Sequence, residues 1–140
     1  LNPRLFQMEA WRVFVWFGAA LAGGLVLFGL IFSQFTYTTT FPIGNAFAMV
    51  MFQVFVVAYG EEVFFRGVLA ERLRAIPSAA IFSVFHLAAY SAAGLNFAAF
   101  FTAFVFGILF AFIYYATRER AGIGVVWALH VSWNLSLLFF

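Results

Sequence analysis

Cysteine, aspartate and lysine are absent from this chain of 140 residues. Without cysteine there is no disulfide, no thiolate nucleophile and no cysteine-ligated metal site. Without aspartate the chain cannot use a pair of catalytic aspartates, and without lysine it cannot use Schiff-base or serine–lysine chemistry. These absences leave glutamate and histidine as the main groups from which a catalytic site could be built.

Charge of either sign is scarce as well. The chain has seven basic and five acidic residues, so that 9% of it is charged, whereas about 25% is usual for a soluble domain. Hydrophobic residues make up 66% of the chain, and the mean hydropathy is +1.06. So few charges cannot cover the surface of a water-soluble domain of this size. The sequence therefore predicts an integral membrane protein in contact with the lipid bilayer, and no nucleic-acid partner.

Long apolar runs, divided by charges and turn residues, predict membrane-spanning helices. At about 20 residues per span, we expect five, at about residues 11–32, 44–69, 77–90, 96–115 and from the glycines at 122 and 124 to the C-terminus. The expected fold is all-α: a polytopic helical bundle in a single transmembrane domain over residues 1–140. In the first span Ala19 and Gly23 are four apart, as are Ala20 and Gly24, which favours close helix packing.

The arginines between the spans indicate the orientation of the bundle. With five spans, six arginines fall on one side of the membrane: Arg4, Arg12, Arg72, Arg74, Arg118 and Arg120. The two loops on the other side, at residues 33–43 and 91–95, carry no charge. Arginine and lysine are enriched in cytoplasmic loops. We therefore expect the N-terminus in the cytoplasm and the C-terminus outside.

Strongly polar residues also occur inside three of the predicted spans. The second contains Glu61, Glu62 and Arg66, the third contains His86, and the fifth contains His130. A charge near the bilayer centre costs about 2.5–3.5 kcal/mol on insertion scales. Counted from the arginines at the helix ends, Glu61, His86 and His130 each lie roughly 15 Å into the membrane. Buried polar groups must satisfy one another, so we expect these side chains to converge.

The spacing of these groups separates a structural pair from a candidate site. Glu62 and Arg66 are four apart, which is typical of a structural ion pair on one helix. Glu61 has no such local partner, and an unpaired carboxylate in a membrane indicates function. A buried glutamate can act as a general base toward water. Asn134 shares a helix face with His130, and an amide with an imidazole can donate hydrogen bonds to an oxyanion.

Other types of intramembrane hydrolase fit the sequence poorly. The zinc-binding run His-Glu-x-x-His is absent, because Leu87 follows His86. No Gly-x-Ser occurs, which argues against a rhomboid-type serine nucleophile. Ser132 lies between His130 and Asn134, but its position on the helix points it away from His130.

Three motifs occur in order on three separate predicted helices. They are Glu-Glu-x-x-x-Arg ending at Arg66, Phe-x-x-x-His from Phe82 to His86, and His-x-x-x-Asn from His130 to Asn134. In this combination the chain resembles the CAAX protease and bacteriocin-processing family (CPBP, also called Abi) of intramembrane endopeptidases. The resemblance covers about residues 45–137. It implies a hydrolase that cleaves a peptide bond in a membrane-associated or prenylated (CAAX-type) peptide or protein.

The resemblance also implies roles for individual residues. Glu61 would activate the attacking water with help from His86. His130 and Asn134 would stabilise the oxyanion.

By the same resemblance, Glu62 and Arg66 would support the site. The family is commonly labelled metalloprotease, although a metal-free glutamate mechanism has also been argued for it. Glu61, His86 and His130 would make a three-ligand catalytic Zn²⁺ site, and the two mechanisms are equally open at this point.

Two functions of other classes are also compatible with the sequence. One is a non-enzymatic membrane immunity or scaffold protein that binds a peptide or partner through the same core; the intact motifs argue against it. The other is a proton- or ion-coupled transporter, because glutamate and histidine at mid-membrane also build proton relays. Transporters usually show internal repeats and broken helices, and neither is evident. The chain also looks short at its N-terminus, and we expect that helices completing the substrate cavity precede it.

Overall fold

The computed structural model of the chain describes residues 9–32, 45–90 and 97–139. Within these ranges there are five helices and no strand, which confirms the predicted all-α membrane bundle. The second helix is continuous but changes type along its length, and its segments carry separate labels. The first helix is α1 Ala10–Phe32, and the last three are α5 Ala75–Tyr90, α6 Phe97–Ala121 and α7 Gly124–Phe139. The segments of the second helix are α2 Ala46–Met51, η3 Phe52–Ala58, α3 Tyr59–Glu62, η4 Val63–Ala70 and α4 Glu71–Leu73.

Three of the helices are long and apolar enough to cross a membrane: Ala10–Ile31, Ala46–Leu73 and Phe100–Ala121. The helices α5 and α7 have 16 residues each, which is about 24 Å of helix against a hydrocarbon core of about 30 Å. Two predicted ends were too early, because the second helix continues to Leu73 and α6 continues to Ala121. Their last turns carry arginines, whose charge is favourable at a helix C-terminus.

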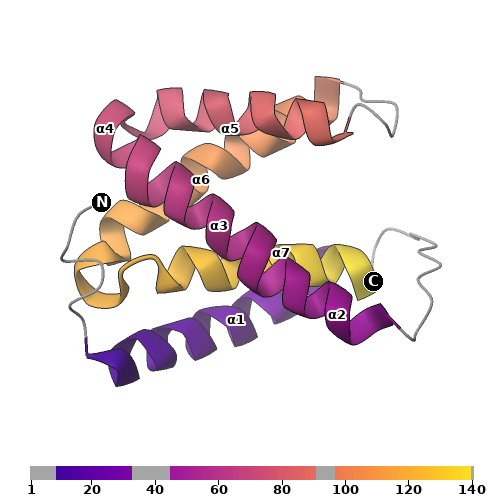
Figure 1. The fold of residues 1–140 in the computed structure, drawn as a ribbon, viewed down its shortest axis with the longest axis vertical. Helices are drawn as coiled ribbons and strands as arrows, with labels where there is room; N and C mark the ends of the chain where they lie inside the picture. The colour runs from indigo at the N-terminus through magenta and orange to yellow at the C-terminus, as the bar shows by residue number, and fades with distance from the viewer. Residues whose placement is uncertain (1–8, 33–44, 91–96, 140) are drawn as a thin grey trace.

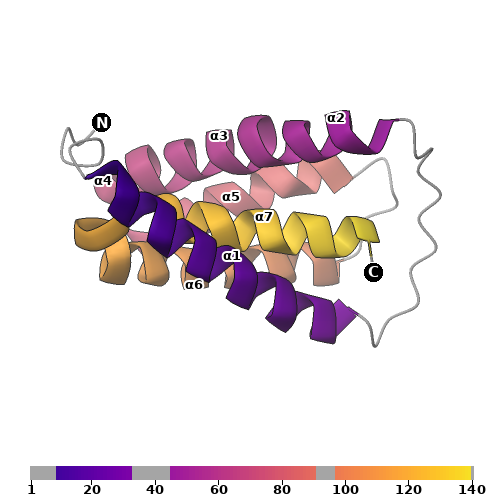
Figure 2. The ribbon, with the colours of Figure 1, turned by 90° about the horizontal axis from the view of Figure 1, so that it is seen from below.

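The bundle consists of two helix pairs crossed by the second helix: α5 and α6 are antiparallel, whereas α1 and α7 run parallel to each other (Figure 1). Helix α5 packs along α6, and α1 packs close to α7. Figure 1 shows the second helix running diagonally across both pairs, and Figure 2 shows it as a layer on one side of α7. Its η3 segment contacts α7, while its η4 segment contacts α5 and α6. The α3 turn, which carries the acidic pair, therefore lies where the two helix pairs meet.

Two stretches of the second helix are π-helical, in which each N–H reaches a carbonyl five residues back. These are η3 and η4, and they lie on either side of the short α-helical stretch α3. The sequence analysis used α-helical spacing along this helix, and the structure departs from that spacing in these two segments. A π-helical turn holds more residues than an α-helical turn, so it changes which side chains share a face.

The arginine-bearing helix ends lie at one end of the bundle. The start of α1, the segment α4 and the end of α6 are together at the left of Figure 1. These ends carry Arg12, Arg72 and Arg118, among others. Arg4 and the two uncharged loops lie outside the described residues. The described arginines outside the site are thus gathered at one end, as the sequence predicted.

A cluster of polar side chains joins α4 to α6 at this end. Glu71 accepts a hydrogen bond from Tyr114 Oη at 2.9 Å and forms an ion pair with Arg118. The neighbouring Tyr115 donates to the carbonyl oxygen of Ala70 at 2.7 Å. The cluster therefore fixes the end of the second helix against α6, and hydropathy alone gave no sign of it.

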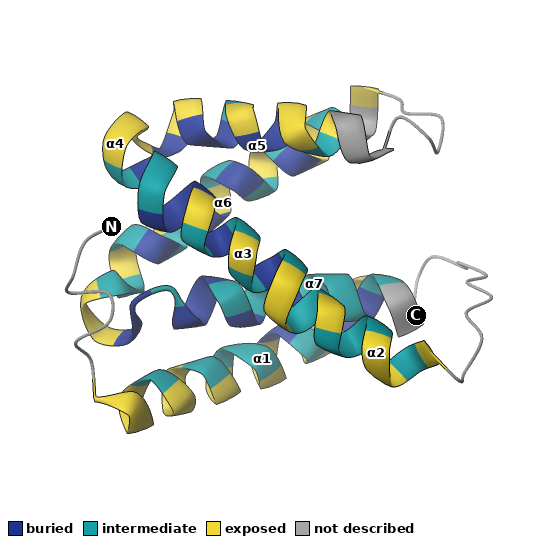
Figure 3. Ribbon diagram, viewed as in Figure 1, coloured by how far each residue is buried: buried dark blue, intermediate teal, exposed yellow. Residues whose placement is uncertain are grey.

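Close packing of α1 on α7 depends on a glycine. An ideal Cβ built on Gly24 would lie 2.5 Å from Ser132 Oγ, whereas one built on Gly23 meets nothing within 4 Å. Ser132 donates hydrogen bonds to the carbonyl oxygens of Ala128 and Leu21, the latter across the α1–α7 contact at 3.1 Å. Of the two predicted small-residue faces, the one with Gly24 packs on α7, and the one with Gly23 is exposed. Figure 3 shows mostly exposed and half-buried residues along α1.

We predict that Gly24→Ala destabilises the bundle by about 1–3 kcal/mol, because the added methyl overpacks the contact with Ser132. Gly23→Ala is the matched control, and we expect it to be neutral or slightly stabilising, since alanine favours the helix by about 0.5–1 kcal/mol over glycine. Thermal unfolding of both variants in one detergent measures the difference. Equal midpoints for the two would contradict the assigned packing face.

Candidate active site

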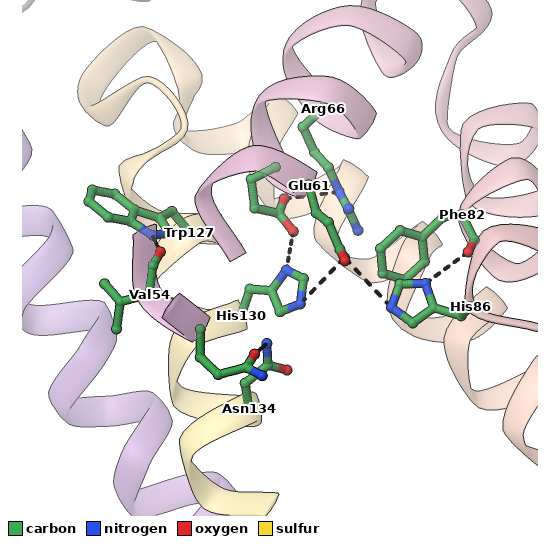
Figure 4. Close-up of polar contacts among 10 residues, drawn as sticks. Val54, Glu61, Arg66, Phe82, His86, Trp127, His130 and Asn134 are labelled. Carbon is green, nitrogen blue, oxygen red and sulfur yellow. Dashed lines mark hydrogen bonds and ion pairs between the residues drawn. The ribbon is translucent and has the colours of Figure 1, made fainter. Parts of the chain in front are cut away.

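Glu61 lies between two imidazoles that come from different helices. Its Oε2 atom is 3.6 Å from Nε2 of His86 on α5 and 3.8 Å from Nε2 of His130 on α7. Figure 4 shows the carboxylate between the two rings. The structure thus brings together the three groups that the sequence analysis expected to converge.

The distances from the two Nε2 atoms to Oε2 of Glu61 are too long for direct hydrogen bonds, which have a donor–acceptor distance of about 2.7–3.2 Å. The Oε2 atom of Glu61 is buried and accepts no hydrogen bond from any described residue. Buried polar atoms are satisfied in more than about nine cases out of ten, by protein or by ordered water. The geometry therefore suits a small polar molecule shared between Glu61 and a ring nitrogen.

Glu62 is the centre of a fully buried charged network. Its Oε2 atom is 3.1 Å from Nε of Arg66, and its Oε1 atom accepts a hydrogen bond from Nδ1 of His130 at 2.7 Å. Glu62 is 0% exposed and Arg66 is 1% exposed. The sequence predicted the Glu62–Arg66 pair, which is confirmed, but it gave no sign of the bond to His130. That bond fixes the ring so that Nε2 faces Glu61.

Phe82, the first residue of the Phe-x-x-x-His motif, contacts the network from α5. Its ring lies 4.6 Å below the guanidinium carbon of Arg66 and 4.1 Å from the ring of His86. Nδ1 of His86 donates to the carbonyl oxygen of Phe82 at 2.9 Å, so that Nε2 is the nitrogen turned to Glu61. Phe110 on α6 adds a second ring at 5.4 Å from Arg66. A cation between two aromatic faces is stabilised by about 0.5–2 kcal/mol per contact.

Asn134 lies one turn beyond His130 on α7 (Figure 4). Its Nδ2 atom donates to Oε1 of Gln53 at 3.1 Å, and both residues are half-buried. On the same helix, Nε1 of Trp127 donates to the carbonyl oxygen of Val54 at 2.8 Å. Asn134 is therefore on the face of α7 expected from its spacing to His130, but its bond is to a residue that the sequence analysis missed.

Gln53 was missed because α-helical spacing places it on the wrong face. It lies nine residues before Glu62, which is about two and a half α-helical turns and so predicts opposite faces. In the structure both side chains nevertheless reach α7, Gln53 from the π-helical segment η3 and Glu62 from α3. The one signal in the sequence is that Gln53 is an amide in an otherwise apolar stretch of the second predicted span.

An open, mostly apolar groove runs beside Glu61. Its volume is about 350 Å³. It is lined by Val56, Val57, Gly60, Glu61, Phe64, Phe65 and Phe85. Several of these side chains are exposed, among them Phe64 at 49% and Phe85 at 54%. The groove thus leads from the outer surface of the bundle, between the second helix and α5, to the Glu61 carboxylate.

The three residues expected as zinc ligands are not arranged as a metal site. Among the described residues, no group of three or more His, Asp or Glu side chains is placed so that it could hold a metal ion. Glu61, His86 and His130 therefore do not form a ligand set in this arrangement. We derive the chemistry below from the chain's own groups and water.

Comparison with known protein families gives a match over the part of the chain that contains these residues. Residues 43–136 match the family described as type II CAAX prenyl endopeptidase Rce1-like. This range includes all three motifs and every residue of the Glu61 site. No curated protein and no solved structure matches the chain. Because the match covers most of the chain and contains the site, the chain belongs to the Rce1-like family of type II CAAX prenyl endopeptidases.

Proposed function

We propose that the chain is an intramembrane endopeptidase in which Glu61 activates a water molecule for attack on a peptide carbonyl. The observation that carries this proposal is the buried, unbonded Oε2 of Glu61 between the Nε2 atoms of His86 and His130. A general base must lie within hydrogen-bond reach of the proton it removes, directly or through water. Membership in a protease family supports this function and does not favour the non-enzymatic alternative.

The proposed reaction starts with water held by Glu61 and by Nε2 of His86. With its Nδ1 proton donated to Phe82, a neutral His86 has a lone pair on Nε2 that can accept from this water. Glu61 removes one proton while the water oxygen bonds to the carbonyl carbon, which gives a tetrahedral oxyanion. When the C–N bond breaks, Glu61 returns the proton to the departing amine. Proton and electron counts then balance without any further reactant.

We assign oxyanion stabilisation to His130 and Asn134. The bond between Nδ1 of His130 and Glu62 leaves Nε2 on the side of Glu61, where an N–H on that nitrogen would be directed at the oxyanion. The Nδ2 group of Asn134 has a second N–H beyond the one it gives to Gln53. Losing one such donor costs about 10²–10³ in turnover in enzymes that cleave acyl groups.

The apolar groove beside Glu61 suggests the nature of the substrate. Its open side presents phenylalanine and valine side chains at the level of the membrane-crossing part of the second helix. A lipidated or membrane-embedded segment could bury its apolar part there while the peptide bond reaches Glu61. This fits a family that is described by prenylated CAAX substrates. We further propose that the arginine-bearing end of the bundle faces the cytoplasm.

We predict that Glu61→Gln lowers the cleavage rate by at least about 10²–10⁴, the usual contribution of a general base. The amide keeps the shape of the side chain but cannot take a proton. Turnover of a farnesylated CAAX peptide by purified protein, followed by mass spectrometry, measures the loss. Glu9→Gln, at an exposed carboxylate, is the control. Full turnover by Glu61→Gln would show that another group is the base.

Removing one charge of the buried Glu62–Arg66 pair should lower the free energy of unfolding more than removing both charges does. We predict that Arg66→Met destabilises the fold by about 3–5 kcal/mol, because Glu62 loses its compensating charge. Adding Glu62→Gln should recover part of this loss. The exposed Arg12–Glu9 pair, also 3.1 Å long, is a matched control for which we expect less than about 1 kcal/mol. Unfolding free energies in detergent measure both pairs, and equal costs would contradict the proposed support role.

The proposed reaction uses no metal ion, so we expect cleavage to be independent of metal. Treatment with a strong chelator, followed by its removal, should leave peptide cleavage unchanged, because every group in the proposed reaction belongs to the chain or to water. Cleavage assays before and after treatment, with zinc added back in one arm, measure this. Loss of activity that only zinc restores would contradict the proposed mechanism.

A further inference from the structure

We infer that Gln53 is a positioning residue that orients the carboxamide of Asn134 for the oxyanion, an inference that rests on the function proposed above. Its Oε1 atom accepts from Nδ2 of Asn134 at 3.1 Å. No motif that identified the family includes Gln53, and it lies eight residues before Glu61 in an apolar stretch of the chain. An amide in such a stretch needs a partner, because an unsatisfied polar group in lipid costs several kcal/mol.

The chemistry of two facing amides gives this contact a function. A carboxamide has donors at one end and an acceptor at the other. Only the nitrogen end of Asn134 can donate to an oxyanion. In the structure Oε1 of Gln53 accepts from Asn134, so the end of Asn134 that it holds is the nitrogen end. One N–H then bonds Gln53 and the other stays available to the substrate.

The backbone of the second helix makes the contact possible. With α-helical spacing, Gln53 would face away from the side that carries Glu62. The π-helical segment η3, which contains Gln53, turns it toward α7. His130 and Asn134, four apart on α7, are then held by Glu62 and Gln53 respectively. The two oxyanion donors are thus each fixed by a polar residue of the same opposing helix.

A third contact on this face, from Trp127 of α7 to Val54 of η3, holds the two helices together. Nε1 of Trp127 donates to the carbonyl oxygen of Val54, the residue after Gln53, at 2.8 Å. The indole also packs on Phe17 and Tyr59, with ring centroids 4.5 and 5.1 Å away. Trp127 therefore holds η3 against α7 even when the Gln53 side chain is changed. A substitution at Gln53 should for that reason act on Asn134 and not on the packing of the helices.

We expect Gln53→Met, which keeps length but removes the acceptor, to lower kcat about 10-fold, a part of the loss that follows removal of an oxyanion donor. KM should stay within about two-fold, because the contact does not touch the bound substrate in the ground state. Gln53→Glu keeps an acceptor and should retain kcat within about three-fold of the native value. The control is Phe52→Leu, next to Gln53 and 50% exposed, which should match the native enzyme.

A double-mutant cycle separates positioning from a general structural effect. In an Asn134→Ala background, Gln53→Met should cause no further loss of kcat. The same 10-fold loss in both backgrounds would overturn the inference while leaving the proposed function intact. A native chain that cleaves no peptide, with Glu61→Gln indistinguishable from it, would instead overturn the proposed function and with it the role of Gln53.

A second measurement tests the contact without activity. The chain has four asparagines, so labelling asparagine with ¹⁵N gives a short list of side-chain amide signals in detergent. The signal of Asn134 is the one lost in Asn134→Ala. We expect it to move toward the position of a free amide in Gln53→Met and to stay hydrogen-bonded in Gln53→Glu. An unchanged signal in Gln53→Met would show that Gln53 does not hold Asn134.

Discussion

A fully buried carboxylate, Glu62, constrains most of what surrounds the candidate site. A charge cannot remain unpaired in a membrane-embedded bundle, so its two oxygens need partners with N–H donors. Arg66 on the same helix and His130 on α7 supply them. The guanidinium in turn lies against Phe82 of α5 and Phe110 of α6. One ionic requirement therefore fixes the relative positions of four helices.

The same network leaves Glu61 in a different environment from its neighbour. Glu62 has its partners at hydrogen-bonding and ion-pairing distance, while Glu61 faces two imidazole nitrogens at 3.6 and 3.8 Å. Adjacent residues of identical chemistry thus have different neighbours: Glu62 pairs with Arg66 and His130, whereas Glu61 lies beside the apolar groove and between two imidazoles. The different roles proposed for the two carboxylates follow from the direction in which each side chain leaves the helix.

The π-helical segments are the second condition for the site. They lie on both sides of the acidic pair, and π-helical turns are found frequently at functional sites. Through η3 the second helix presents Gln53 as well as Glu62 to α7. At the other end of this helix, the cluster of Glu71, Tyr114 and Arg118 holds α4 to α6. The helix is thereby held at both ends of the site, with Glu61 between the two attachments.

The order of apolar runs and charges predicts the five helices and the motif residues that share a level, because a helix that crosses lipid needs a long apolar run and a charge there needs a partner. From matched depth alone, Glu61, His86 and His130 could be expected to meet. The bond from Glu62 to His130, the π-helical turns and the place of Gln53 are seen only in the packed bundle. Each depends on the rotation of one helix against another, and packing against neighbouring helices sets that rotation, whereas hydropathy and α-helical spacing do not contain it.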